Sequence, residues 1–323
     1  MLSKTRIKNQ LKYVLDKTNF KIGKKYEGKV RDNYVINGKR IIITTDRISA
    51  FDRVLCTIPF KGQVLNQTAG FWFEKTKKIV ANHAISVPDP NVMVVKECKP
   101  YPVEMIVRGY ITGVTTTSAW YNYERRIRNF CGNILPEGLK KNQKFGKPII
   151  TPSTKAEHGL HDESISGKEI IKRKLVDEKT YRKMEKAALA LFEFGTKLVA
   201  KNNLILVDTK YEFGNLNGEL ILIDEIHTPD SSRFWIKDSY EALFSKGKEP
   251  VKLDKEFVRQ WLSNRGFIGK GPIPKIPENV KIEAAKRYIT AYEMITGRKF
   301  EAKNEDVLER VEKKISEYFG PSE

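Results

Sequence analysis

Charged side chains interrupt an apolar segment near the middle of the chain, residues 207–235, with the sequence VDTKYEFGNLNGELILIDEIHTPDSSRFW. The neighbouring runs LILV and LILI indicate buried strands. A charge at the end of a buried strand is costly unless it is paired or takes part in chemistry. We therefore look for a site first among the charged residues of this segment, which are Asp208, Lys210, Glu212, Asp224, Glu225 and Arg233.

Two of these carboxylates are candidates for a metal site. Asn217-Gly218 is a strong signal for a two-residue hairpin turn, and counting outward from it places Glu212 within one residue of lying opposite Asp224. Two carboxylates that close repel each other unless a cation lies between them. Mg²⁺ takes one or two carboxylates and completes its shell with water and phosphate oxygens. The alternative is that both side chains are solvated on the outer face of the hairpin.

The remaining charges of the segment suggest a reacting centre and an anion site. Asp208 and Lys210 are two residues apart, so they point to the same face of a strand and can form an ion pair there. The sequence HTPDSSR supplies hydroxyl groups, a turn-forming proline and Arg233, which suits a phosphate held by charge-assisted hydrogen bonds. An ordinary Pro-Asp turn is the simpler reading of the same residues.

A second basic group lies upstream in YEGKVRDNY. It matches neither GxxxxGK[ST] nor GxGxxG, so neither a P-loop nor a Rossmann site is supported. Lys29 and Arg31 alternate onto one face of a predicted strand pair, where they can reach nucleotide phosphates, while Val30 faces the opposite side. An edge strand protected by charges is the alternative.

Composition limits the class of protein. The 323 residues carry a formal charge of +19, but the basic residues are spread along the chain and interleaved with acids, as in RKMEKAALALFEFGTK, which argues against nucleic acid as the partner. No run of about 18 apolar residues predicts a membrane span, and the first 20 residues lack the apolar centre of a signal peptide. Three cysteines without CxxC spacing fit a reducing compartment. We expect a cytoplasmic protein.

The elements around these residues predict an α+β fold in two lobes. Residues 1–107 should form an antiparallel sheet with a helix near 62–80 across one face, and residues 108–323 a larger lobe of strands and helices. Helical periodicity and capping signals in the second lobe mark residues 177–202, 254–264, 278–297 and 305–319.

Seven motifs in order resemble the SAICAR synthetases, the phosphoribosylaminoimidazole-succinocarboxamide synthases of purine biosynthesis. They are GKVRD, TTDRISAFD, KGQVLNQTAGFWF, VEMIVRGYITG, TPSTKAEHGLHDESIS, VDTKYEFG and DEIHTPDSSRFW. The resemblance implies a two-lobed ATP-binding fold distantly similar to protein kinases. It also implies that ATP, Mg²⁺, L-aspartate and carboxyaminoimidazole ribonucleotide (CAIR) give SAICAR, ADP and phosphate through an acyl phosphate.

The resemblance also assigns roles, residue by residue. Lys29, Val30, Arg31 and Lys155 match nucleotide-binding positions, and Glu212 and Asp224 match the magnesium carboxylates. Arg108, Ser118 and Arg233 match the groups that hold the ribonucleotide phosphate. Asp162, Asp208 and Lys210 match positions near the imidazole and its carboxylate, with Asp208 and Lys210 as the catalytic candidates. Ser49 and Asp52 of DRISAFD match the border of the amino-acid or ribonucleotide pocket.

One departure from the family leaves a choice open. Where some members have Gly-Ser-Ala-Trp, this chain has TGVTTTSAW, so Thr115, Thr116 or Thr117 can replace Ser118 as the phosphate hydroxyl. The histidines His158, His161 and His227 are expected to be surface or supporting residues, since the attacking amine needs to lose only one proton, to Asp208 or to water. A phosphotransferase and a basic RNA-binding module are the competing functions. We expect small-molecule partners only, in a monomer or homodimer.

Overall fold

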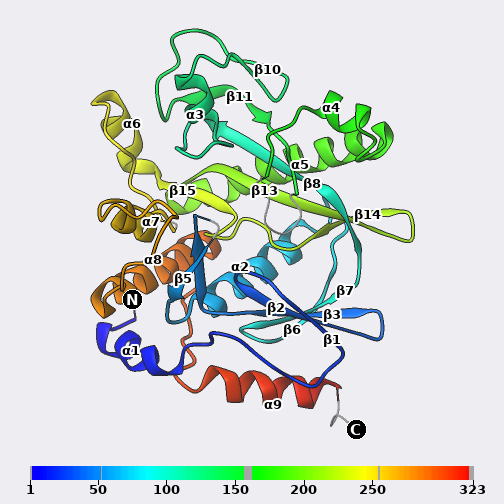
Figure 1. The fold of residues 1–323 in the computed structure, drawn as a ribbon, viewed down its shortest axis with the longest axis vertical. Helices are drawn as coiled ribbons and strands as arrows, with labels where there is room; N and C mark the ends of the chain where they lie inside the picture. Colours follow the sequence, from blue (N-terminus) through cyan, green and yellow to red (C-terminus); the bar gives the residue numbers. More distant parts are fainter. Residues whose placement is uncertain (1, 52, 156–161, 254, 320–323) are drawn as a thin grey trace.

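The computed structural model describes residues 2–51, 53–155, 162–253 and 255–319. Two antiparallel sheets form its centre, and most helices lie around them rather than alternating with single strands (Figure 1). This arrangement is the α+β class that the order of elements predicts.

The first sheet has five strands in the order β1-β2-β3-β7-β6. Asn37 and Gly38 both have positive φ, as a two-residue hairpin turn between β2 and β3 requires. A smaller sheet of two strands, β4 and β5, follows β3 along the chain. The strands are β1 (Lys24–Glu27), β2 (Arg31–Ile36), β3 (Lys39–Thr44), β4 (Arg47–Ala50), β5 (Arg53–Thr57), β6 (Ala84–Asp89) and β7 (Val92–Lys96).

The second sheet has six strands built around the long pair β8 and β13. β8 lies along one side of β13, while β14 and β15 share its other side. A further two-stranded sheet, β9 and β10, belongs to the segment before β11. The strands are β8 (Lys99–Tyr110), β9 (Asn129–Phe130), β10 (Asn133–Ile134), β11 (Lys144–Ile150), β12 (Ser153–Thr154), β13 (Leu204–Leu216), β14 (Glu219–Ile223) and β15 (Ser232–Ile236).

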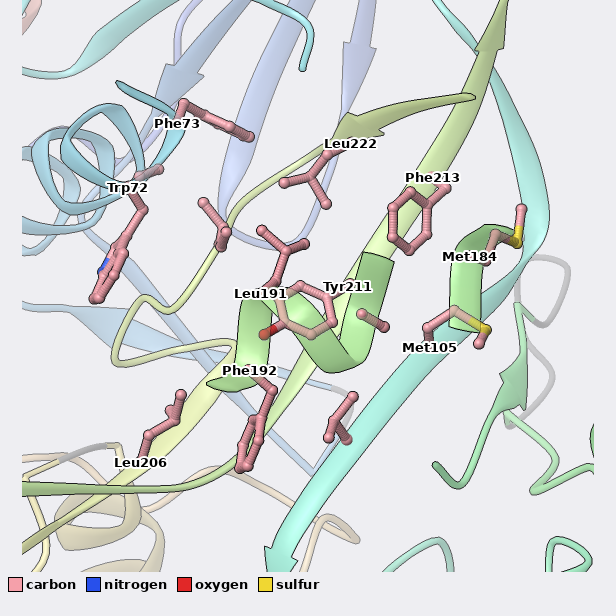
Figure 2. Close-up of a cluster of buried hydrophobic side chains, with 14 of the residues drawn as sticks. Trp72, Phe73, Met105, Met184, Leu191, Phe192, Leu206, Tyr211, Phe213 and Leu222 are labelled. Carbon is pink, nitrogen blue, oxygen red and sulfur yellow. The ribbon is translucent and has the colours of Figure 1, made fainter. Parts of the chain in front are cut away.

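The main core lies between β13, β8 and two helices, α2 and α5 (Figure 2). α5 begins after Asp177, whose side chain accepts the backbone N–H of Thr180 at 3.0 Å. Its buried residues Met184, Ala188 and Leu191 recur at helical spacing and pack against the sheet. The helices are α1 (Lys4–Asn9), α2 (Lys61–Thr76), α3 (Ala119–Glu124), α4 (Gly167–Lys172), α5 (Glu178–Val199), α6 (Lys237–Ser245), α7 (Glu256–Ser263), α8 (Glu278–Thr296) and α9 (Val307–Phe319).

The helix α9 covers the outer side of the first sheet, at the bottom of the view in Figure 1. Val307, Val311 and Ile315 pack there in one apolar cluster with residues of β2, β3 and β7. The guanidinium of Arg310 donates to Asp89 at 2.7 Å, at the end of β6. Among the described residues, no helix combines the length and the apolar character needed to cross a membrane.

Two details of the sequence prediction need correction. Lys29 and Val30 are not in a strand: they lie in the loop between β1 and β2, where the N–H of Gly28 donates to the carbonyl of Arg31 at 2.8 Å and closes a tight turn. Val30 therefore does not face away from Lys29 and Arg31, because all three border the same cavity. Local alternation of residue types could not reveal this turn.

Candidate active site

The register of the second sheet brings the predicted charges together. Asp208 of β13 lies directly opposite Arg108 of β8 on one side and Arg233 of β15 on the other. Further along β13, Glu212 is paired with Ile223, the neighbour of Asp224, so the predicted register of the hairpin is right to within the one residue allowed. Both positions of the Asn217-Gly218 turn have positive φ.

One cavity, of about 280 Å³, lies between the two large sheets, and we name it cavity 1. Its lining includes all six residues predicted to bind nucleotide or metal, namely Lys29, Val30, Arg31, Lys155, Glu212 and Asp224. His83, which the sequence did not mark, also lines it. Burial lowers the pKa of His83 to about 3, so its imidazole is neutral near pH 7.

Arg31 is a cation of cavity 1 that two carboxylates hold in place. Its guanidinium donates to Asp224 at 2.8 Å and to Glu225 at 2.6 Å. Burial opposes the charge, but the two carboxylates outweigh it and raise the pKa of Arg31 above its ordinary value. A guanidinium held along two of its nitrogens keeps its remaining N–H groups in a fixed direction.

A second cavity, of about 290 Å³, adjoins the same stretch of β13, and we name it cavity 2. Arg108, Ser118, Asp208, Lys210 and Arg233 line it, which unites the predicted phosphate-holding and catalytic residues. Asp208 accepts from Arg108 at 3.1 Å and from Arg233 at 2.5 Å.

The loop before α3 supplies one group of hydroxyl side chains to cavity 2. Thr115, Thr117 and Ser118 line the cavity, whereas Thr116 is not among the lining residues. The hydroxyls of Thr115 and Ser118 are 2.7 Å apart, so they form one joint group. Gly113 has φ +93°, and a Cβ there would lie 2.4 Å from the Ser118 hydroxyl oxygen, so only glycine fits.

Lys210 lines cavity 2 and contacts two carboxylates that line cavity 1. Its ammonium contacts the carboxylate of Glu212, that of Glu104 at 2.9 Å and that of Asp224 at 3.8 Å. Burial alone would lower the pKa of Lys210, but these carboxylates raise it well above its ordinary value, so the side chain stays charged. The predicted direct pair between Asp208 and Lys210 is wrong. Asp208 pairs instead with Arg108 and Arg233 on the neighbouring strands. Lys210 pairs with Glu212 of its own strand and with Glu104 of β8.

Two of the predicted residues that the structure describes, Ser49 and Asp162, are not brought into this arrangement. Ser49, on β4, is not among the described residues that line either cavity. Asp162 is exposed, although its charge is close enough to Glu104 to contribute to the raised pKa of that residue, whose main cause is burial. Asp52 lies outside the described residues, as do His158 and His161.

Other functional candidates could not be found from their local sequence. Glu104 is half-buried beside Lys210, and only the charge within the apolar stretch VEMIV marks it. Lys61, the first residue of α2, is fully buried, and its ammonium donates to Asp230 at 2.7 Å. Asp230 lines cavity 2 together with Lys255 and Arg259, near the start of α7. Long-range packing, rather than any local pattern, places these groups.

His227, in the loop after β14, is a supporting residue, as expected. Its side chain is fully buried, and its Nε2 is 2.5 Å from the hydroxyl of Tyr211. Burial lowers its pKa to about 3. Gly195 of α5 allows this close packing, since a Cβ there would lie 2.4 Å from the imidazole ring.

The fold and the two adjoining charged cavities define an α+β enzyme that acts on anionic small molecules. Residues 24–271 match the family model described as SAICAR synthetase, so the chain belongs to the SAICAR synthetase family. The family prediction is confirmed.

Individual relatives agree with this assignment. A phosphoribosylaminoimidazole-succinocarboxamide synthase of Legionella pneumophila is 48% identical over 290 residues, which cover 89% of this chain and 92% of the relative. The solved SAICAR synthase of Saccharomyces cerevisiae, complexed with SAICAR, has a TM-score of 0.78 and 34% identity, with 89% of this chain and 100% of that one covered. A SAICAR synthetase solved in complex with ADP has a TM-score of 0.65 and 26% identity, with 86% and 100% covered.

Proposed function

We propose that the chain is an ATP-dependent ligase that joins L-aspartate to the carboxylate of CAIR and releases SAICAR, ADP and phosphate. The observation that carries this proposal is the pair of charged cavities that meet at Lys210 and Glu212. Ligands bound in the two cavities would have their reacting groups near these two residues. Family membership and relatives solved with ADP and with SAICAR support the same assignment.

ATP is assigned to cavity 1. Its lining includes apolar side chains such as Ile42 and Ile223, which suit a base. It also includes the cations Lys29, Arg31 and Lys155, which suit phosphates. We also propose that the chain divides into lobes at residues 1–107 and 108–323, with the nucleotide between them.

The donor set fits a magnesium ion held jointly with the nucleotide. Among the described residues, no three His, Cys, Asp or Glu side chains converge as a complete metal site. However, the single ammonium of Lys210 contacts both Glu212 and Asp224, so these two carboxylates can share one cation. Two carboxylates plus phosphate and water oxygens are the usual surroundings of Mg²⁺ in nucleotide enzymes. When bound, Mg²⁺ would neutralise developing charge on the phosphates.

CAIR is assigned to cavity 2. Arg233 and the Thr115–Ser118 loop would hold its phosphate by charge-assisted hydrogen bonds, with Arg108 beside them. Asp208 fixes the direction of both arginines through the two ion pairs described above. Lys210 would then lie beside the carboxylate of CAIR.

The reaction proceeds in two steps in this proposal. A carboxylate oxygen of CAIR attacks the γ-phosphorus of ATP, the bond to ADP breaks, and an acyl phosphate forms, with Lys210 and Arg31 opposing the negative charge. The amine of aspartate then attacks the acyl carbon, and the carbon–oxygen bond to phosphate breaks. The proton that the amine loses passes to Asp208 or to water. Holding the reactants together supplies much of the acceleration.

A magnesium-dependent ADP-release assay with each substrate omitted in turn tests the proposal. We expect ADP release to require ATP, CAIR and aspartate together, with SAICAR formed in equal amount. ADP release that needs CAIR but forms no SAICAR would indicate a phosphotransferase instead.

A further inference from the structure

The loop between β14 and β15, residues 224–231, borders both cavities. Its first residue, Asp224, lines cavity 1, while Pro229, Asp230 and Ser231 near its other end line cavity 2. Glu225 lies between these groups and is not among the described residues that line either cavity. Its side chain is only 8% exposed, so its charge needs an explanation other than direct contact with a ligand.

One carboxylate oxygen of Glu225, Oε2, accepts hydrogen bonds from two residues. It accepts from the guanidinium of Arg31 at 2.6 Å and from the hydroxyl of Thr228 at 2.5 Å. Arg31 lines cavity 1, and Thr228 begins the turn that leads to cavity 2. One buried oxygen atom thus connects a cation of the first cavity with the backbone of the second.

On the first side, Glu225 fixes the plane of a guanidinium. Arg31 donates to Asp224 through Nη1 and to Glu225 through Nη2. The two acids together limit rotation of the guanidinium plane about the Cδ–Nε bond, because they hold two different nitrogens of the same rigid group. The orientation of Arg31 toward phosphate therefore depends on Glu225.

On the second side, Glu225 fixes a hydroxyl group. Thr228 has one hydroxyl hydrogen, which it donates to Glu225. The lone pairs of the same oxygen are left to accept the N–H groups of Asp230 at 3.3 Å and Ser231 at 3.2 Å. Without Glu225, the hydroxyl can rotate and the turn loses its preferred acceptor geometry.

The far end of this turn is held separately. Asp230 accepts from the buried ammonium of Lys61 at 2.7 Å and from the hydroxyl of Tyr288 at 2.6 Å. The segment that continues through Ser232 to Arg233 is therefore fixed at Asp230 from one side and at Thr228 from the other. Glu225 holds the Thr228 end through its hydrogen bond with the Thr228 hydroxyl.

We propose that Glu225 is a positioning residue for both substrates, which orients Arg31 in cavity 1 and the Thr228–Arg233 turn in cavity 2. The identity of the two ligands as ATP and CAIR rests on the function proposed above. Glu225 touches neither ligand, so it acts only through Arg31 and Thr228.

The test is a comparison of Michaelis constants in the full chain. Glu225→Ala removes the shared acceptor and should raise KM for ATP and KM for CAIR, each at least about tenfold, since two charge-assisted hydrogen bonds are lost. Glu225→Gln keeps an oxygen acceptor without the charge, so both constants should fall between those of wild type and Glu225→Ala. Glu219→Ala removes an exposed carboxylate from the neighbouring strand β14 and serves as the matched control, with both constants unchanged.

Variants of Thr228 distinguish the effect of Glu225 on cavity 2 from its effect on cavity 1. Thr228→Val removes the hydroxyl at nearly constant shape and should raise KM for CAIR severalfold while KM for ATP stays within twofold. Thr228→Ser restores a hydroxyl and should return KM for CAIR toward the wild-type value. These variants remain informative if Glu225→Ala does not fold.

The outcomes are distinct. A Glu225→Ala enzyme in which only KM for ATP rises would show that Glu225 serves Arg31 alone, and unchanged constants with a lower melting temperature would show a purely structural role. Either result overturns the two-sided role, while wild-type ligation of aspartate to CAIR would leave the proposed function standing. Absence of that ligation in the wild-type chain would overturn both.

Discussion

The two faces of β13 differ. One face carries Asp208, Lys210 and Glu212, which border the two cavities. The other face carries Tyr211 and Phe213, which pack in the main core (Figure 2). The core face excludes water from aromatic surface and contributes to stability in proportion to the area buried. The cavity face holds partly buried charges that share ion pairs, and such pairs gain little net stability because desolvation offsets their attraction. One strand thus carries stability on one face and chemistry on the other.

This contrast is tested most strongly on the core face. Phe213→Ala removes a buried ring that is 1% exposed and should lower the free energy of unfolding by about 3–5 kcal/mol. Denaturant unfolding followed by circular dichroism measures it. The fraction that remains folded should keep KM for ATP and for CAIR near the wild-type values. A loss below about 1 kcal/mol would contradict the role of this face.

A substitution at the cavities should lower the turnover rate rather than the stability. Asp224→Asn removes one negative charge from the proposed magnesium site at nearly constant shape and should reduce turnover at least about 100-fold, equivalent to about 3 kcal/mol of transition-state stabilisation. The free energy of unfolding should change little. Steady-state ADP release at saturating Mg²⁺ measures the effect, and near-normal rates would exclude Asp224 as a metal ligand.

The pH dependence of the free energy of unfolding distinguishes buried neutral histidines from the charged groups of the cavities. A histidine in the unfolded chain titrates near pH 6.5, whereas the pKa of His227 in the folded protein is about 3 because of burial. Below pH 6.5 the unfolded state binds a proton that the folded state does not, so the free energy of unfolding should fall by about 2 kcal/mol between pH 7 and pH 5 for this residue. The loss continues until the pH reaches about 3.

The matching variant is His227→Gln, which cannot titrate. His83 has a pKa of about 3 for the same reason and should cause a second loss of the same sign. The variant should therefore lose about 2 kcal/mol of the fall in unfolding free energy that the wild type shows between pH 7 and pH 5. An unchanged slope would mean that His227 is not the neutral, buried group described here.

The smallest effect is expected where charge is kept and shape is altered. Arg233→Lys preserves the positive charge of cavity 2 but cannot make a forked contact, so KM for CAIR should rise about tenfold, or about 1.4 kcal/mol. KM for ATP should stay within a factor of about two. Equal increases in both constants would show that Arg233 does not serve cavity 2 alone.

Much of the cavity face could be predicted because its signals are local. The Asn217-Gly218 turn determines which residues of β13 and β14 are opposite each other, and this fixed the approximate position of Glu212 relative to Asp224. The two-residue spacing of Asp208 and Lys210 placed both on one face of the strand. The helix α5 was also predicted, close to its observed ends.

What could not be predicted depends on contacts between distant residues. Glu104 and Arg108 meet β13 only because β8 pairs with it, across about a hundred positions of sequence for which no local pattern gives the register. That pairing also explains why Asp208 and Lys210 find partners other than each other. Lys61 has no recognisable motif, because its partners come from another loop and from α8. The lobe boundary after residue 107 stays a prediction, and β8 extends across it.

The position of α9 has a consequence for how the chain is made. The apolar outer side of the first sheet is complete in sequence by residue 96, yet it is covered by residues 307–319. During synthesis, which releases the N-terminal part first, this sheet stays open on one side while some two hundred further residues are added. The ribosome-bound chain thus exposes an apolar surface until residues 307–319 have emerged, so termination within α9 would produce an aggregation-prone protein even though every residue that lines the two cavities is present.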